Sequence, residues 1–369
     1  MTDASSRVIG IELNTSGAGY QGLNYSSASG TLTINRQESA NIRTNRVVQD
    51  QVQTSYQAGM TLSLDLYYDN TDNQALSLLW ESAFRMARET VTAHDTLSIN
   101  NTSVSAATTL GGLEVGDILR ITTSSGGVAY RRITAISGLT ATINAAVASA
   151  SGAEGPDHRL VVGSTAIPLA VMIKDEGNEE VFSGMEVDSF RIRIADQERT
   201  TVDMTLVGED SDGGNAGTTT ITDSPAVEVF NSKGHVKTTM LAGSDVEGLD
   251  FEWGLSNSLR SRTVVGQLPA VGVSAGTARV TGAWSQYFET FTEYQKAIND
   301  TASDLIIGHE TANGAYAWSL PNIKYSDQTR EHSGQDTDII VRLPFEGLGA
   351  PATVDAEQSS LRMCFFNLP

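Results

Sequence analysis

The 369-residue sequence predicts a mainly β fold, with two tandem β-sandwich or barrel repeats, one amphipathic α-helix in each, and a small β-barrel inserted in the first. Three observations carry this prediction. Two stretches of the chain resemble each other at a constant spacing, many segments alternate apolar and polar residues, and one stretch is interrupted by closely spaced glycine turns. A chain of this length can bury two or three separate cores.

The internal repeat is the first observation. Residues 34–48 (INRQESANIRTNRVV) align with residues 251–265 (FEWGLSNSLRSRTVV) at a shift of 217 positions. A second similarity aligns the residues around Asp196 with those around Asp327, at a shift of 131 positions. The difference, 217 − 131 = 86, indicates that the first repeat holds about that many extra residues between its helix and its later strands.

Helix and strand patterns follow in both repeats. Apolar residues at spacings of three and four predict one amphipathic helix in each. The first helix is indicated by Leu76, Leu79, Trp80, Ala83, Phe84 and Ala87, and the second by Tyr287, Phe288, Phe291, Tyr294 and Ile298. Alternating strands are indicated by Leu62, Leu64 and Leu66, by Phe190, Ile192 and Ile194, by Val202, Met204 and Leu206, and by Ile339, Val341 and Leu343.

The third observation concerns the extra segment. Short strand-like pieces at 117–121, 128–133 and 141–143 are separated by glycine turns, and the small residues of 149–156 are typical of a linker. The predicted domains are therefore 1–94 with 165–225 for the first repeat, 95–164 for the inserted β domain, and 226–369 for the second repeat. Because the insertion interrupts one repeat only, we expect an outward decoration that assembly does not require.

Composition and charge exclude several classes of protein. The chain carries 24 Lys and Arg against 44 Asp and Glu, a formal net charge of -20, which argues against a surface that clamps nucleic acid. Its 40% hydrophobic residues and the lack of a long apolar run argue against a disordered or membrane-spanning chain. The segment 1–7 has no basic region followed by an apolar stretch, so we expect folding in a cytoplasm.

We expect no catalytic residue, no metal site and no cofactor. The histidines show no paired ligand spacing, and neither a nucleophile elbow nor a phosphate-binding glycine loop is present. These histidines are His94, His158, His235, His309 and His332. The single cysteine, Cys364, lies among apolar residues and is interpreted as a buried thiol in a strand.

Several of these features together resemble a known family. They are the long polar loop 36–46, the strand 59–64, a single helix, and then the strands between 182 and 209. This arrangement is similar to the tail-tube fold of long-tailed, siphovirus-type bacteriophages, a fold shared with the inner tube of contractile tails and the tube of type VI secretion. The resemblance covers both repeats and not the insertion. It implies a major tail-tube protein, a structural virion protein of the viral tail that is assembled in the cytoplasm of the bacterial host.

The resemblance also implies partners. Rings of this family resemble sixfold rings of tube domains, so a chain with two copies would close a pseudo-hexameric ring as a trimer. Such rings stack into a hollow tube through which phage DNA is ejected. The implied partners are further copies of the chain, other tail proteins such as the tape measure, tail terminator and distal tail protein, and transiting double-stranded DNA without specific binding. No membrane partner is implied.

Charge suggests which residues line the channel. The insertion accounts for -1 of the charge, so -19 remains on the repeats, and we expect a negative wall that repels DNA phosphates. The candidate lumen-lining residues are Asp65, Glu186, Asp188, Asp203, Asp336 and Asp338. Exposure to the outer solvent is the alternative for each of them.

A second group of candidates is basic. Arginines in or beside the long loop of each repeat could bind carboxylates of the next ring. These residues are Arg36, Arg43, Arg46, Arg260 and Arg262. Ordinary solvated loop arginines are the alternative interpretation.

Two other functions remain open from the sequence. The first is another phage tail or virion component, such as a distal tail or decoration protein, which has less reason to carry a duplicated domain. The second is a β-sandwich glycan-binding module or hydrolase. That function would need a carboxylate pair and an aromatic platform, and aromatic residues make up only 7% of the chain, mostly at core-like spacings.

Overall fold

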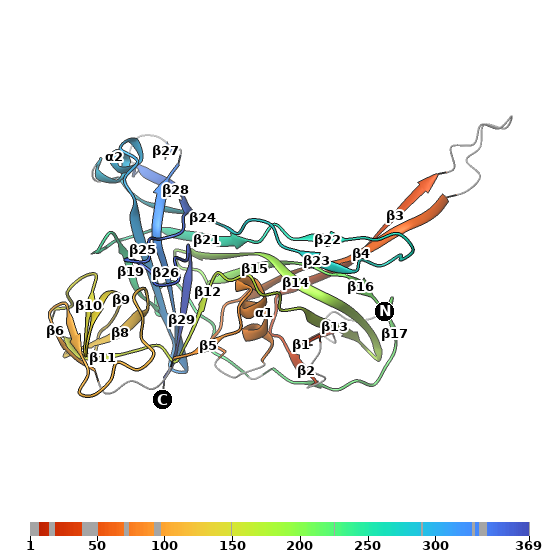
Figure 1. Ribbon diagram of the computed structural model, residues 1–369, viewed down its shortest axis with the longest axis horizontal. Coiled ribbons are helices and arrows are strands. Elements are labelled where there is room, and N and C mark those ends of the chain that lie inside the picture. The colour runs from red at the N-terminus through yellow and green to blue at the C-terminus, as the bar shows by residue number, and fades with distance from the viewer. Residues whose placement is uncertain are drawn as a thin grey trace.

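The computed structural model confirms the mainly β fold (Figure 1). It describes residues 7–14, 19–38, 51–69, 74–91, 97–148, 150–224, 226–288, 291–326, 329–331 and 338–368. Within these residues, the strands form a 21-stranded sheet, a six-stranded sheet and a two-stranded sheet, accompanied by two helices. None of the described helices is long and apolar enough to cross a membrane.

The chain builds the large sheet in two passes, separated by the small one. The first pass consists of β1 (Arg7–Leu13), β2 (Tyr20–Gly22), β3 (Ser27–Glu38), β4 (Gln51–Asp65), α1 (Ala75–Phe84) and β5 (Glu89–Thr90). The small sheet contains β6 (Ser98–Asn100), β7 (Ser103–Ser105), β8 (Ile118–Thr123), β9 (Val128–Ser137), β10 (Thr140–Ile143) and β11 (Ala150–Glu154). The first pass resumes with β12 (His158–Val161), β13 (Leu169–Asp175), β14 (Asn178–Ala195), β15 (Thr201–Val207), β16 (Asp210–Ser211), β17 (Asn215–Ala216) and β18 (Ile221–Thr222).

The second pass follows the connector after β18. It consists of β19 (Val236–Leu241), β20 (Ser244–Asp245), β21 (Asp250–Ser256), β22 (Arg260–Arg262), β23 (Gly272–Ser274), β24 (Arg279–Tyr287) and α2 (Thr292–Ile298). It ends with β25 (Ser303–Glu310), β26 (Gly314–Tyr325), β27 (Thr329–Glu331), β28 (Ile340–Gly347) and β29 (Arg362–Asn367). The two-stranded sheet is the β22–β23 hairpin.

The two halves of the large sheet share one order of strand pairing. Antiparallel neighbours in the first half run β1, β13, β14, β15, β4, β3. Those in the second half run β19, β25, β26, β28, β24, β21. Along the chain the matching strands also follow in the same order, with α1 after β4 and α2 after β24. β14 pairs with β21 over residues 189–195, so the two halves form one continuous sheet.

Residues that align at the shift of 217 positions are not buried to the same extent. Ile34 on β3 is 43% exposed, whereas Phe251 on β21 is 4% exposed. Residues 39–48 of the first aligned segment lie outside the described residues. Both aligned segments nevertheless enter long hairpins, β3–β4 in the first half and β21–β22 with β23–β24 in the second, and these point toward the same end of the molecule (Figure 1).

The main core lies beneath the junction of the halves. The strands alternate as the sequence predicts, so that Leu62, Leu64 and Ile192 are buried. All four tryptophans of the chain are fully buried, namely Trp80, Trp253, Trp284 and Trp318. Trp318 contacts Trp80 and Trp253 edge to face at ring-centroid distances of 5.4 and 5.7 Å. Because aromatic pairs of this geometry add to the large area that each ring buries, the junction is a rigid part of the fold.

Both predicted helices form, with different bounds. α1 ends at Phe84 because Arg85 adopts a left-handed conformation at φ 53°, so Ala87 lies beyond the helix. The prediction that Tyr287 belongs to the second helix is wrong, because it ends β24 and pairs with Ile340. Ile339 lies just outside β28 and is 43% exposed. At Tyr287 the short spacing fitted either a strand end or a helix turn, and strand pairing decided between them.

The insertion forms a compact sheet with its own core and is firmly docked. Its last strand is β11, which occupies most of the predicted linker because its backbone pairs with β8. β12, which the sequence assigned to the inserted domain, instead pairs with β5 and β29 of the large sheet. Ile118 and Tyr130 of the insertion pack against the second half, in a cluster that contains Met240, Ile306 and Phe366. The insertion therefore packs directly on the second half of the large sheet, and its role as an outward decoration that assembly does not require stays a prediction.

Candidate channel and assembly surface

One face of the large sheet is left open to solvent. The open face consists of the side chains directed away from the core on β21, β24 and β28 and on residues 59–65 of β4, 201–207 of β15 and 189–195 of β14. Hydroxyl side chains are frequent on it, namely Thr61, Ser63, Ser189, Thr201, Thr205, Ser256 and Thr281. This composition follows from the period of two in a strand, which places polar residues opposite the buried ones.

The open face carries charges of both signs. Its carboxylates are Asp65, Asp203, Asp250, Glu252 and Glu346. Its guanidinium groups are Arg191, Arg193, Arg279 and Arg342, together with Arg199 of the β14–β15 turn. The strands of the open face therefore carry five carboxylates against four guanidinium groups, 4 − 5 = -1, and the β14–β15 turn adds Asp196 and Glu198 as well as Arg199.

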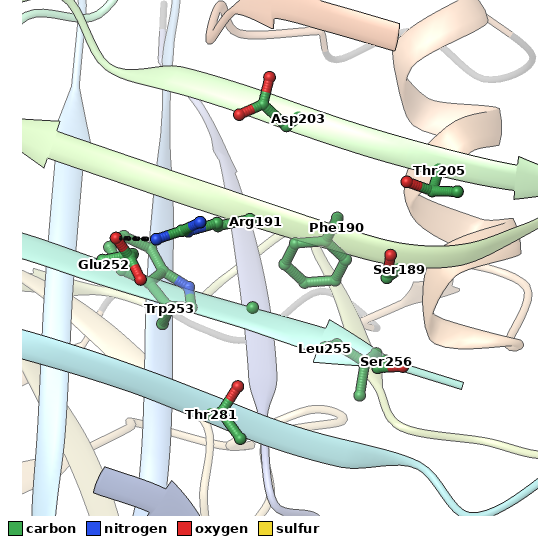
Figure 2. A pocket seen from close by; sticks show the side chains of 11 residues that line it. Ser189, Phe190, Arg191, Asp203, Thr205, Glu252, Trp253, Leu255, Ser256 and Thr281 are labelled. Carbon is green, nitrogen blue, oxygen red and sulfur yellow. Dashed lines mark ion pairs between the residues drawn. The ribbon is translucent and has the colours of Figure 1, made fainter. Parts of the chain in front are cut away.

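Many of these charges lie in direct pairs. Arg191 forms an ion pair with Glu252 across the β14–β21 junction, as Figure 2 shows, and stands opposite Asp203 in the β14–β15 ladder. Arg199 Nη1 lies 2.5 Å from Asp65 Oδ2. The Asp203 carboxylate accepts a hydrogen bond from the Ser63 hydroxyl at 2.5 Å. Cross-strand neighbours of opposite charge hold each other in place on a sheet.

A shallow hollow of about 530 Å³ lies on this face, at the junction of the halves (Figure 2). Its wall includes Ser189, Thr205 and Thr281, and its middle is Gly254. A Cβ atom at Gly254 would collide with the backbone oxygen of Phe190, so only glycine allows the two strands to approach here. The hollow is a polar depression in a sheet and does not enclose a buried site.

The candidate lumen residues fall into different places. Asp65 and Asp203 lie on the open face, where each has a polar partner. Asp188 is half-buried, and its carboxylate accepts a hydrogen bond from the backbone N–H of Leu259 at 2.6 Å. Asp338 is exposed just before β28, and Asp336 lies outside the described residues.

Glu186 does not fit the expectation of a channel-lining residue. It is 4% exposed and forms an ion pair with Arg85, the residue that follows α1. A register shift between Val187 and Ser189 interrupts the alternation along β14, so that Val187 pairs with the buried Leu206 and Glu186 pairs with Val207. Strand periodicity alone cannot distinguish a buried, paired carboxylate from a core-facing apolar residue.

The candidate basic residues gather at one end of the molecule. Arg36 on β3 and both Arg260 and Arg262 on β22 are exposed. The two hairpins touch, because the backbone N–H of Tyr56 donates a hydrogen bond to the carbonyl oxygen of Leu268 at 2.9 Å. Figure 1 shows β22 and β23 running alongside β4. Arg43 and Arg46 lie outside the described residues.

The sequence analysis missed a buried ionic network that joins the insertion to the large sheet. Arg362 is fully buried and contacts Asp117 at 2.5 Å and Asp355 at 3.0 Å. Arg159 contacts the other oxygen of Asp117 at 2.9 Å and Glu89 at 2.8 Å. The only signal in the sequence is that Arg362 lies in an otherwise apolar strand. A charged side chain that is buried in this way needs partners of opposite charge.

Two buried titratable side chains have strongly shifted pKa values. Burial raises the pKa of the Cys364 thiol to about 12, so it stays protonated and unreactive at neutral pH. Burial also lowers the pKa of His309 to about 3, with a smaller effect from the nearby charge of His235. Among the described residues, no three His, Cys, Asp or Glu side chains are grouped as metal ligands would be.

Comparison with known families identifies the class of this protein. Residues 8–347 match the family model described as phage tail tube protein, which covers both halves of the sheet and the insertion. The chain belongs to the phage tail tube protein family. A search of curated proteins found no match. Membership of the tail tube family makes this chain a structural component of the tail of a bacteriophage. It also supports assembly with further copies of the chain and with other tail proteins.

Proposed function

We propose that this tail tube protein closes into trimeric, pseudo-hexameric rings, and that the rings stack into the hollow tail tube through which phage DNA is ejected. The observation that carries the proposal is the junction of β14 and β21. It joins two halves with the same order of strands and pairings inside one chain. We interpret the halves as tandem tail-tube repeats, with the first comprising 1–94 and 165–225 and the second 226–369.

The internal junction provides a template for the contact between protomers. If a ring repeats one contact around its axis, the end of the second half meets the start of the first half of the next protomer. In the internal junction these elements are β14 and β21. The strands at the matching positions are β26, followed by β27, in one protomer and β3 in its neighbour, so we expect these strands to pair. Within the described residues β3 pairs only with β4, which leaves its other edge available for such pairing.

Contacts between rings are assigned to the hairpin end. The β3–β4 hairpin extends beyond the main body, and the β22–β23 hairpin runs beside β4 toward the same end of the molecule (Figure 1). Their exposed arginines, Arg36, Arg260 and Arg262, are suited to binding carboxylates of the adjacent ring, and Arg43 and Arg46 of the same loop are proposed to join them. The exposed apolar residues Val264 and Val265, at 48% and 104% exposure, would be covered by the same contact.

The proposal also assigns a setting. Assembly takes place in the cytoplasm of the bacterial host, and the tube of this siphovirus-type tail binds the tape measure inside and the terminator and distal tail proteins at its ends. The channel candidates are Asp65, Asp203 and Asp338, with Asp336, two positions before Asp338 in the sequence, and Asp188 at the junction. A distal tail or decoration protein is a weaker alternative, because a family match over 8–347 supports the tube itself.

Electron microscopy of the purified full-length chain, with its mass measured in solution, tests this function. We expect rings or stacked tubes whose averages show six similar units built from three chains. The ring mass should be three times that of the 39.3 kDa chain. A stable monomer at high concentration, or rings of six chains, would contradict the trimeric arrangement.

A further inference from the structure

We propose that the helix α2 of one protomer covers the core-side face of β3 in the next protomer of the ring. The core-side face of β3 consists of the positions on the same side of the sheet as the buried residues of β4, namely Ala28, Gly30, Leu32 and Ile34. The inference rests on the proposed ring and adds a second contact between its protomers, separate from the pairing of strand edges.

Strand pairing shows which positions of β3 and β21 match. β3 begins at Ser27, opposite Ser63, which lies two residues before the end of β4. β21 begins at Asp250, opposite Ser285, which lies two residues before the end of β24. The two strands therefore match at a shift of 223 positions, 250 − 27 = 223. At this shift the counterparts of the core-side face of β3 are Phe251, Trp253, Leu255 and Asn257.

The matching positions are buried on β21 and open on β3. All four residues on β21 and at its end are at most 4% exposed. None of the four on β3 is buried, and Ile34 is 43% exposed. Because Leu32 and Ile34 are apolar and lie on the side that forms a core in the second half, this face of β3 is suited to a covering element.

α1 covers the core side of β21 within one chain. The side-chain amide of Asn257 donates a hydrogen bond to the carbonyl oxygen of Ala83, near the end of α1, at 2.9 Å. Trp80 of α1 contacts Trp318 at a ring-centroid distance of 5.4 Å, and Trp318 contacts Trp253 of β21 at 5.7 Å. The first half thus supplies the helix that buries the first strand of the second half.

α2 has the opposite character to α1. Phe84, the last residue of α1, is fully buried, whereas Ile298, the last residue of α2, is 69% exposed. α2 also lies at the far end of the molecule from the β3–β4 hairpin, so it does not cover β3 of its own chain (Figure 1). An open strand face and an exposed helix therefore occur in one chain, at positions whose counterparts contact each other.

Each helix lies against the strand that forms, or is proposed to form, a junction. The backbone N–H of Val187 on β14 donates a hydrogen bond to Ser82 Oγ of α1 at 3.1 Å, and β14 forms the internal junction with β21. The hydroxyl of Tyr325 on β26 donates to Glu293 of α2 at 2.9 Å. Because β26 is the strand proposed to meet β3 of the neighbour, the same arrangement brings β3 of the neighbour to α2.

One pair of residues marks the contact. Asn257 meets α1 one residue before its end, and the position that matches Asn257 on β3 is Ile34. Ile34 of the neighbour is therefore placed beside Ile298 of α2. Both side chains are apolar and exposed in the single protomer, so burying them together favours association.

Cross-linking tests this pair. Ile34→Cys and Ile298→Cys are combined in one full-length chain, assembled into rings and treated with a short thiol-reactive cross-linker. The native Cys364 does not interfere, because it is fully buried and burial raises its pKa to about 12. We expect denaturing gels to show covalently linked products that stop at three chains, whereas each single-cysteine variant stays monomeric.

A matched control uses another exposed apolar residue. Leu139→Cys replaces Ile34→Cys in the double variant, since Leu139 on the insertion is 44% exposed, as Ile34 is 43% exposed. This variant should remain monomeric in the gel. If the double-cysteine chain does not form rings, an equal mixture of the two single variants takes its place, and linked dimers are then expected.

A second variant tests the contact without cross-linking. Ile298→Asp places a charge on an exposed position, so melting of the unassembled protomer should not change. We expect the protein concentration needed for rings to rise at least about tenfold, because the charge would have to be buried on assembly. Leu139→Asp makes the same change on the insertion and should assemble like the wild type.

The outcomes separate the inference from the function on which it rests. Rings of the double-cysteine variant that remain monomeric in the gel would overturn the inference, as would assembly of Ile298→Asp at wild-type concentrations. Linked products of more than three chains would also overturn it, because the contact would then lie between rings. If the wild-type chain forms no rings in the microscope, the proposed function itself is wrong.

Discussion

The two halves of the large sheet follow the same strand order, yet their helices are buried very differently. Nine of the ten residues of α1 are buried in the main core. On α2, by contrast, Ile298 is 69% exposed, and Phe291 just before it is 51% exposed. The second half instead receives the inserted domain, whose Ile118 and Tyr130 pack against its strands.

This difference shows that strand pairing and coverage of a sheet are separate problems. The helix ALSLLWESAF is apolar nearly all around and can be buried on every side, whereas TEYQKAI is mostly polar and stays at the surface. A matching topology therefore does not imply matching cores, and the variants below test where each half derives its stability.

The largest effect is expected from removing the inserted domain. Replacing residues 98–154 with a short Gly/Ser linker would expose Met240, Ile306 and Phe366 of the second half. Burial of one such side chain contributes roughly 1.5–3 kcal/mol, against about 5–15 kcal/mol for a whole domain. We expect aggregation or loss of the unfolding transition in calorimetry. Shortening the exposed turn 124–127 is the control, and a deletion variant that melts like the wild type would restore the idea of a dispensable decoration.

A smaller but still large effect is expected at the ionic network. Asp117→Asn leaves the buried Arg362 and Arg159 without their shared carboxylate, which should lower the free energy of unfolding by about 3–5 kcal/mol. Asp175→Asn breaks an exposed pair with Arg7 and should cost less than about 1 kcal/mol. Urea unfolding of both variants measures the difference. Equal losses would mean that the network does not hold the insertion in place.

The helices themselves provide the third test. Leu79→Ala on α1 removes a fully buried side chain and should cost about 2–5 kcal/mol in the unassembled protomer. Ile298→Ala on α2 should change the free energy of unfolding by no more than about 0.5 kcal/mol, because that side chain is 69% exposed. Thermal melting at concentrations below assembly measures both. A large loss from Ile298→Ala would show that α2 belongs to the core after all.

The smallest effect is expected from replacing the buried His309 on β25. The matching strand of the first half, β13, is apolar at its centre. Burial lowers the pKa of His309 to about 3, so between that value and its ordinary pKa of 6.5 only the unfolded chain binds the proton. Stability should therefore fall as pH falls through this window, by about 1 kcal/mol between pH 6 and 5. His309→Leu should reduce that slope in urea titrations at several pH values. An unchanged slope would assign the acid sensitivity to other groups.

Local patterns were sufficient for much of the fold. The alternation of Leu62 and Leu64 and of Phe190 and Ile192 predicted strands with one buried face, and the structure has them. The apolar spacing around Leu79 predicted α1. The patterns were insufficient where an element ends, as at Tyr287, because a strand end and a helix turn share the same short spacing, and only a partner strand decides.

Less of the candidate site could be predicted from the sequence. Asp65 and Asp203 were placed on a polar strand face correctly, since alternation determines the face. Nothing local indicated that Glu186 would be buried beside Arg85, or that Arg191 would be paired with Glu252 of a strand 61 positions away, 252 − 191 = 61. Such partners are brought together by sheet topology, which a single sequence does not specify.

The sequence by itself determined the mainly β class of the structure and the acidic balance of the whole chain, and it predicted two repeats with an inserted segment. These properties follow from composition, periodicity and spacing, which are local or additive. Only the tertiary structure decided that the insertion is docked through Asp117 and Arg362, that Arg191 of the open face is paired with Glu252, and that β14 joins β21. Each of these depends on long-range pairing of segments, because charges and apolar surfaces act on whatever the fold places beside them.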